Sequence, residues 1–185
     1  DTLIQKKQGK IAMGFGGNPK DTSAVRGGPA FEVLFNVDTY LKKKGVRDHF
    51  ELTFFAPMKK PGQKMGEKAL VMMDKMFKMT NIKKKIGTKI TSFEEDGICF
   101  EDGTKLESDL TMFISAGTGH SILKESGLPL SDAGYVVTNE YNEIEGFDGI
   151  YAIGDSASLM GPEWRAKQGH VAEVMAKNVA YNIIN

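Results

Sequence analysis

A short apolar run, Lys10-Ile11-Ala12-Met13-Gly14-Phe15, predicts a buried β-strand close to the start of the chain. After a loop rich in glycine and polar residues, the apolar spacing becomes helical from Pro29 to Lys44, and Gly45 ends the helix. A second strand at residues 51–56 and a second helix at 67–80 follow. This β-α-β-α order indicates a doubly wound α/β unit.

Three short β-like runs come next, at residues 89–94, 98–100 and 105–107. Two Asp-Gly pairs separate them, and Asp-Gly is a strong hairpin signal. A continuous apolar strand at 110–114 then completes the unit. The sequence therefore predicts an α/β fold, a Rossmann-like doubly wound sheet into which a three-stranded antiparallel β-meander is inserted.

The last third of the chain differs in character, and we place a domain boundary near residue 120, giving domains 1–120 and 121–185. A strand is predicted near residues 135–138 and an apolar strand at 150–153. A helix then follows, whose apolar stripe is formed by Val171, Val174, Met175, Asn178, Val179 and Ile183.

Composition excludes several classes of function. The 24 basic and 24 acidic side chains cancel, which argues against a nucleic-acid partner. A single cysteine, Cys99, rules out an internal disulfide, and the histidines show no ligand spacing, so we predict no metal site. The lysine runs 42–44 and 83–85 are interpreted as solvated faces rather than lipid-binding patches. With neither a signal core nor a spanning segment in the sequence, the expected location is cytoplasmic.

The strongest functional motif is Gly149-Ile150-Tyr151-Ala152-Ile153-Gly154-Asp155-Ser156-Ala157. An apolar strand here delivers a glycine and a carboxylate at its end, where α/β sheets bind ligands. Gly154 lets a ligand approach the backbone, and Asp155 can accept hydrogen bonds from a sugar-like hydroxyl. From these residues alone, an aspartate that merely caps the following turn is an equal alternative.

Taken as a unit, these nine residues resemble the second FAD motif of the two-dinucleotide-domain, pyridine nucleotide-disulfide oxidoreductase-like flavoproteins. The run 161–170, Gly-Pro-Glu-Trp-Arg-Ala-Lys-Gln-Gly-His, and the run 26–32, Arg-Gly-Gly-Pro-Ala-Phe-Glu, narrow the resemblance. Together they are similar to the sulfide:quinone oxidoreductase branch and its relatives, the type II NADH dehydrogenases and flavocytochrome c sulfide dehydrogenases. The resemblance covers essentially the whole chain.

This resemblance implies roles for particular residues. Asp155 would hold the FAD ribityl chain, while Lys167 and Gln168 would lie beside the isoalloxazine, where a cation and helix amides stabilise negative charge on reduced flavin. A solvated helix lysine is the alternative for Lys167, and His170 is interpreted as structural. The implied partners are a quinone and a small reductant such as sulfide, with a peripheral position on the inner face of a membrane. Residues 121–185 would be the returning part of the FAD-binding domain.

Two features depart from this pattern. The cluster Gly14, Gly16 and Gly17 follows a strand, but Pro19 stands where a dinucleotide fingerprint has its last glycine, so we expect NAD(P) binding to be lost. Arg26 stands where the sulfide:quinone enzymes carry a redox cysteine. Cys99, among apolar neighbours, is expected to be buried and inert. The chain alone is therefore not expected to run cysteine-pair sulfide oxidation.

Three interpretations stay open. The chain is part of a sulfide:quinone oxidoreductase-like enzyme, part of a type II NADH:quinone dehydrogenase-like enzyme, or an isolated, non-catalytic domain that binds no cofactor by itself. The family's first FAD motif is a G-x-G-x-x-G turn that would precede Asp1. We therefore expect the chain to be the middle of a larger flavoprotein, inactive and free of FAD when isolated.

Overall fold

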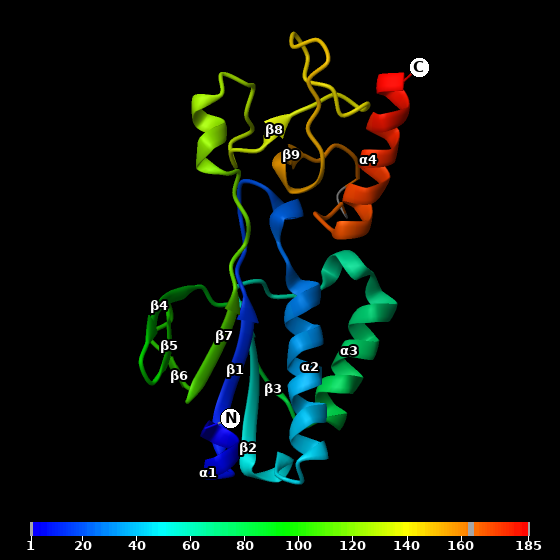
Figure 1. Ribbon diagram of the computed structural model, residues 1–185. Coiled ribbons are helices and arrows are strands. Elements are labelled where there is room, and N and C mark those ends of the chain that lie inside the picture. Colours follow the sequence, from blue (N-terminus) through cyan, green and yellow to red (C-terminus); the bar gives the residue numbers. More distant parts are fainter. Residues whose placement is uncertain (1, 163–164, 185) are drawn as a thin grey trace. The chain divides into compact units, whose positions relative to one another are not determined.

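Figure 1 shows the computed structural model of the chain, which describes residues 2–162 and 165–184. The residues form two compact units. The first comprises the chain up to Gly17 together with Arg26–Ser115, and the second comprises Asn18–Val25 together with the chain from Ala116 onward. The polypeptide therefore enters the second unit twice, first as a short excursion and then for the remainder of its length.

A four-stranded parallel sheet forms the centre of the first unit. Its strands are β1 (Gly9–Phe15), β2 (Phe50–Ala56), β3 (Lys83–Ile86) and β7 (Leu110–Ile114), in the order β3-β2-β1-β7. Helix α2 (Gly27–Lys43) connects β1 to β2 and helix α3 (Glu67–Met79) connects β2 to β3, while a short helix α1 (Thr2–Lys6) precedes β1. Both long helices cover the same face of the sheet (Figure 1). The predicted α/β fold class is confirmed.

Strand β3 was not predicted from the sequence, and the order β-α-β-α-meander-β is corrected accordingly. Its sequence, Lys-Lys-Lys-Ile, has the composition of a solvated segment, yet it pairs with β2 at the edge of the sheet. Lysines are common on edge strands because their charge discourages pairing with another chain. Each lysine also has an acidic partner, at 2.6 Å for Lys83–Glu51, 2.5 Å for Lys84–Asp74 and 2.8 Å for Lys85–Asp102.

The predicted meander is confirmed as an antiparallel sheet of β4 (Ile90–Glu94), β5 (Gly97–Phe100) and β6 (Lys105–Glu107). It packs through Ile98 and Phe100 against Ala12 and Phe55 of the parallel sheet. Because side chains alternate along a strand, Cys99 lies on the opposite face of β5 and is only half-buried. The expectation that this thiol is buried is wrong.

Aromatic side chains fill the space between the sheet and its two helices. Phe31 of α2 and Phe54 of β2 stack with ring centroids 4.7 Å apart, and Phe77 of α3 approaches Phe54 at 5.5 Å. Phe15 of β1 completes the group at 5.8 Å from Phe54. All four are at most 6% exposed. Burial of each phenylalanine contributes about 1.5–3 kcal/mol, so this cluster is a main stabilising element of the first unit.

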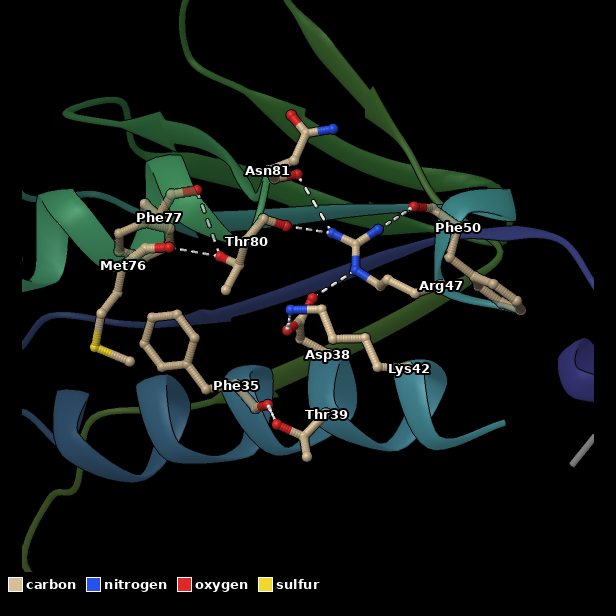
Figure 2. Close-up of polar contacts among 10 residues, drawn as sticks. All are labelled: Phe35, Asp38, Thr39, Lys42, Arg47, Phe50, Met76, Phe77, Thr80 and Asn81. Carbon is tan, nitrogen blue, oxygen red and sulfur yellow. Dashed lines mark hydrogen bonds and ion pairs between the residues drawn. The ribbon is translucent and has the colours of Figure 1, made fainter. Parts of the chain in front are cut away.

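A buried ion pair connects α2 with the start of β2 and the end of α3 (Figure 2). Arg47 belongs to a short 3₁₀ turn, Arg47–His49, and its Nε lies 2.5 Å from the carboxylate of Asp38 on α2. Its remaining guanidinium nitrogens donate to the carbonyls of Phe50 at 2.7 Å and Thr80 at 2.7 Å. One arginine thus satisfies carbonyls at the start of β2 and the end of α3, while Asp38 is 3% exposed.

The second unit contains little regular structure. It has 3₁₀ turns η1 (Thr22–Ala24), η4 (Ser121–Glu125) and η5 (Gly154–Ser156), a two-residue parallel pair β8 (Val136–Val137) and β9 (Ala157–Ser158), and the helix α4 (Gly169–Ile184). A further 3₁₀ turn, η3 (Gln63–Met65), precedes α3 in the first unit. None of the helices within the described residues is long and apolar enough to cross a membrane.

The apolar strand predicted at residues 150–153 is wrong. This segment makes a single antiparallel bridge, between Tyr151 and Glu143, and Ile150 remains 43% exposed. Within the described chain, its backbone pairs only with residues 142–144, through hydrogen bonds from the amide of Ile144 to the carbonyl of Ile150 and from the amide of Ala152 to the carbonyl of Asn142, and this pairing is too short to make a strand. The predicted helix of the last third is confirmed as α4, although none of its residues is buried.

Candidate functional site

The Gly154-Asp155 motif forms the tight turn η5. Gly154 has a positive φ of +60°, a conformation that glycine adopts without strain. A Cβ at this position would also lie 3.2 Å from the Cβ of Ala172 on α4. Asp155, in the first turn of η5, is exposed at the surface. The turn therefore needs its glycine and presents the carboxylate outward.

Helix α4 begins beside this turn. The carbonyl of Gln168 accepts the amide of Ala172 at 3.1 Å, so Gln168 is the residue that starts the helix, and its side chain is exposed. His170, in the first turn, is also exposed. Because Ala172 touches Gly154, η5 packs against the first turns of α4. The N-terminal amides and the positive end of the α4 dipole thus lie on the same segment that contacts the Gly-Asp turn.

Lys167 is enclosed within the second unit and is only 6% exposed. Its backbone amide donates to the carbonyl of Ser23 at 3.0 Å. Its ammonium group donates to the carbonyl of Ala157 and lies 3.8 Å from the ring centroid of Tyr135. Through its backbone amide and its side chain, Lys167 therefore connects the segment before α4 to three other parts of the unit.

The sequence did not reveal Tyr135 as a partner of Lys167. Tyr135 is 2% exposed, and its hydroxyl lies where a Cβ on Gly117 would come within 2.8 Å. Gly119 is equally constrained, because its Cβ would overlap the carbonyl oxygen of Gly134. The sequence around these glycines does not indicate this packing. Their close contacts bring together residues that the sequence gives no reason to pair.

Arg165 is a second residue of the site that sequence reasoning left without a role. Its Nε donates to the carbonyl of Leu159 at 2.8 Å, and Nη1 donates to the carbonyls of Gly161 and Pro162 at 3.3 and 3.2 Å. The arginine therefore folds the loop between β9 and α4 back on itself. Glu163 and Trp164, which belong to the run used for the family resemblance, lie outside the described residues.

The other glycine cluster has a packing role in the structure. A Cβ on Gly14 would lie 2.3 Å from the backbone oxygen of Phe55, so the β1–β2 pairing needs glycine there. The amide of Gly16 donates to Ile114 at 2.9 Å. Gly17 is exposed, and the nearest atom to its would-be Cβ is Met58 Cε at 3.6 Å. After Gly17 the chain leaves the first unit, so no helix begins at this turn.

The two glycine sites therefore differ in what they can do. At η5, an exposed carboxylate can accept hydrogen bonds from hydroxyl groups, and the neighbouring helix start favours negative charge. These are the features that a ribityl chain and a reduced flavin ring require of a protein, so the residues fit the expected group. At Gly14, the backbone packs directly against Phe55, and no helix begins at the turn that follows β1.

The comparisons with known proteins agree with the expected family. The sequence matches the pyridine nucleotide-disulphide oxidoreductase family over residues 37–176, more than half of the chain. In fold, the chain is similar to the sulfide:quinone oxidoreductase of the hyperthermophilic bacterium Aquifex aeolicus, with a TM-score of 0.81 and 21% identity. That similarity covers 100% of this chain and 45% of the other. The expected resemblance to this branch is thus confirmed at the level of the fold.

Two more distant structures share the fold. The reduced CoADR-RHD of Bacillus anthracis matches with a TM-score of 0.63 and 18% identity, over 98% of this chain and 31% of that one. The thioredoxin reductase of T. acidophilum matches with a TM-score of 0.60 and 20% identity, over 96% and 53%. The chain thus spans only part of each of these proteins. With the family match over residues 37–176, it belongs to the pyridine nucleotide-disulphide oxidoreductases, a family of FAD-dependent enzymes.

Proposed function

We propose that this chain is part of an FAD-dependent oxidoreductase of the sulfide:quinone type, which takes electrons from a small reductant such as sulfide and delivers them to a quinone. The observation that carries the proposal is the Gly154-Asp155 turn packed against the start of α4. Support comes from the fold similarity to the Aquifex aeolicus enzyme over the whole of this chain. The proposal includes a peripheral position on the inner face of a membrane, where a quinone can be reached.

In this proposal, residues 121–185 are the returning part of the FAD-binding domain and residues 1–120 are a dinucleotide-binding-like domain. Asp155 accepts hydrogen bonds from the ribityl hydroxyls. Gln168 and the first amides of α4 favour negative charge on the ring system. When bound, FAD supplies reversible two-electron chemistry. The protein groups position the FAD and stabilise its charge.

Lys167 has a distinct part in this proposal. Because its ammonium group lies against Ala157 and Tyr135, it holds the segment that leads into α4 and so sets the position of Gln168. A direct contact between Lys167 and the flavin would require its side chain to leave these partners. We therefore propose that Lys167 acts in the flavin site chiefly by positioning Gln168 and the start of α4.

The type II NADH dehydrogenase-like alternative is the less well supported one. A nicotinamide dinucleotide would need the turn after β1, where Gly14 is packed against Phe55 and the chain departs from the first unit. We propose that this turn, Gly14, Gly16 and Gly17, no longer binds NAD(P). Anaerobic addition of NADH to the whole enzyme is then expected to leave the flavin oxidised, while sulfide bleaches it. Rapid bleaching by NADH would favour the alternative.

Substitution of Asp155 tests the flavin site in the whole protein. Asp155→Ala is expected to weaken FAD binding about tenfold or more, because a hydroxyl of the ligand would lose its charged acceptor. Asp148→Ala, at another exposed aspartate of the same unit, is the matched control and should retain FAD fully. Flavin content is measured by absorbance near 450 nm after dialysis. Full retention of FAD by Asp155→Ala would remove the assigned role.

The isolated 185-residue chain is proposed to bind no FAD by itself. Helix α4 has no buried residue, and Ile183 and Ile184 at its end are 65% and 81% exposed. Such a helix has little packing energy with which to hold the site in shape. The purified chain is expected to be colourless. A yellow preparation with stoichiometric FAD would refute this part of the proposal.

A further inference from the structure

Six of the ten methionines of the chain lie between residues 58 and 79. Four of them, together with one valine, are exposed on η3 and α3: Met65 is 56% exposed, Val71 71%, Met72 67%, Met76 38% and Met79 74%. Other residues form the side of α3 that faces the core, with Phe77 buried and Leu70 and Met73 half-buried. The helix therefore carries apolar side chains on its outer side, where a helix that only covers a sheet carries polar ones.

The exposed methionines of α3 form one row. Met72, Met76 and Met79 follow one another at spacings of four and three residues, which places them on the same side of a helix. Lys68 and Lys75 lie four residues before and three residues after Met72, so they border these methionines. We call these five residues the methionine–lysine row. Single exposed apolar residues are common on proteins, but a contiguous set with a polar border marks an interaction site.

The segment that contains the row is basic, although the whole chain has no net charge. Residues 57–80 hold six lysines and two acidic residues, an excess of four positive charges. The carboxylate of Asp74 is already compensated, because it lies 2.5 Å from the ammonium group of Lys84 on β3. Lys68 and Lys75 are exposed and have no ion-pair partner among the described residues. The row therefore presents uncompensated positive charge beside apolar side chains.

Charge and shape together select the partner of this row. A second copy of the chain would bring two sets of lysines together across a two-fold axis, and like charges oppose such a contact. The outer side of a helix is convex, so a protein partner would need a groove of matching shape. Lipid headgroups and the upper acyl chains close around a convex helix without a preformed groove. An anionic bilayer surface therefore fits both properties.

We propose that the methionine–lysine row of α3 binds the surface of an anionic phospholipid bilayer. The three methionine side chains enter the boundary between headgroups and acyl chains, and the ammonium groups of Lys68 and Lys75 lie at the level of the lipid phosphates. Helix α3, with 13 residues, then lies in the plane of the membrane. This inference deepens the proposed function and rests on its peripheral membrane position, for which it names the contacting surface.

The test is co-sedimentation of the 185-residue chain with lipid vesicles. Vesicles of phosphatidylcholine and phosphatidylglycerol in about equal parts should bind the chain at least about tenfold more tightly than vesicles of phosphatidylcholine alone. About 0.5 M NaCl should remove most of this preference, because it screens the charges at the bilayer surface. Equal binding to both kinds of vesicle, or binding to neither, would overturn the proposal. Tighter binding to soluble polyglutamate than to anionic vesicles would overturn it in favour of an acidic protein partner.

Paired variants of the apolar residues locate the contact. Met72→Gln with Met79→Gln keeps side-chain length and helix propensity, and should weaken binding to anionic vesicles about tenfold, because two groups that enter the bilayer become polar. The matched control is Met160→Gln with Ile122→Gln in the second unit, where the side chains are 64% and 66% exposed. This control should leave vesicle binding unchanged. Equal loss in the two pairs would overturn the assignment to α3.

Paired variants of the lysines test the charge. Lys68→Gln with Lys75→Gln should weaken binding to anionic vesicles about tenfold. Lys124→Gln with Lys177→Gln removes the same charge from exposed positions of the second unit and should weaken binding less than about twofold. Equal loss in both lysine pairs would show that net charge drives binding, and would overturn the role of the row.

All eight substitutions are at exposed positions, so the fold is retained in each variant. Vesicle binding is measured without flavin, and bleaching of the flavin by sulfide is measured in the whole enzyme without vesicles. Loss of one result with retention of the other therefore distinguishes failure of this inference from failure of the proposed function.

Discussion

The two units of the molecule are stabilised in different ways. In the first, helix α2 has five buried residues, and its Phe31 packs with Phe15 and Phe54 of the sheet and Phe77 of α3. In the second, helix α4 is almost as long and buries none. Its neighbours are joined by two-residue strands, short turns and the polar contacts of Lys167 and Arg165.

The difference suggests a division of roles between the structural core of the first unit and the proposed flavin site of the second. The first unit has an apolar core and the features of a domain that folds on its own hydrophobic burial. The Gly-Asp turn and the helix start assigned to the flavin lie in the second unit, whose apolar cluster of Val136, Ile144, Ala152 and Ala157 is smaller and is supplemented by close glycine contacts and hydrogen bonds. Truncation of the buried phenylalanines should therefore act on the stability of the first unit, whereas substitution of exposed residues on η5 and α4 should act mainly on the site.

The largest effect is expected from Phe54→Ala. Phe54 is 1% exposed and contacts three other aromatic rings, so its truncation should lower the free energy of unfolding by about 3–5 kcal/mol. Val174→Ala on α4, where the side chain is 55% exposed, should change it by less than about 0.5 kcal/mol. Urea unfolding followed by circular dichroism measures both. Similar losses in the two variants would break the comparison between the units.

Arg47→Ala should lower the free energy of unfolding by about 3 kcal/mol. It leaves the carboxylate of Asp38, which is 3% exposed, without its closest partner and frees the carbonyls of Phe50 and Thr80. Arg47→Lys should recover little of this, because a single ammonium group cannot reach the same set of acceptors. The measurement is again urea unfolding. Full recovery by lysine would show that charge alone is what matters at this position.

Alanine substitutions at Gly14 and Gly17, the two ends of the glycine cluster, form a matched pair of variants. Gly14→Ala places a methyl group 2.3 Å from a backbone oxygen of β2 and should cost about 2–3 kcal/mol of unfolding free energy. Gly17→Ala places it 3.6 Å from a flexible methionine and should cost less than about 0.5 kcal/mol. Thermal denaturation of the two variants side by side gives the ranking. Equal effects would mean that β1 and β2 can shift to accommodate the new side chain.

The smallest effect concerns pH and the ion pairs of the meander. Lys85 and Thr104 lower the pKa of Asp102, Lys105 lowers that of Asp96, and Lys10 lowers that of Glu107. A carboxyl whose pKa is lower in the folded state stabilises it above the unfolded pKa, near 4, and this stabilisation is lost as the pH falls further. Asp102→Asn should make the decline in Tm below pH 4.5 shallower. Because the pairs are exposed, added salt should reduce the difference.

Much of the first unit could be predicted because its signals are local. The apolar period gave α2 and α3, and the two Asp-Gly pairs gave the meander. Strand β3 was missed because its pairing with β2 is decided by the position of the sheet edge, which three consecutive lysines do not reveal. The same limit applied to residues 150–153, where apolar composition suggested a strand, but the segment forms a single bridge, from Tyr151 to Glu143.

The candidate site was predicted unevenly for a similar reason. The Gly154-Asp155 turn could be identified from nine consecutive residues, and the structure shows why glycine is needed there. The contacts of Lys167 with Tyr135 and with the carbonyl of Ser23 join residues far apart in the chain. No periodicity or spacing in one sequence encodes such pairs, so the enclosed position of Lys167 emerged only from the structure.

The passage of residues 18–25 through the second unit has a consequence for the order of folding. In most α/β units, the first strand and its helix can pair as soon as both leave the ribosome. Here the side-chain amide of Asn18 donates to the carbonyl of Gly117, 99 positions later, and the carbonyl of Ser23 accepts the amide of Lys167. Neither hydrogen bond can form until the later residue has been synthesised. Long-range closures of this kind slow folding. The segment between β1 and α2 should therefore be the last part of the nascent chain to become protected from proteases.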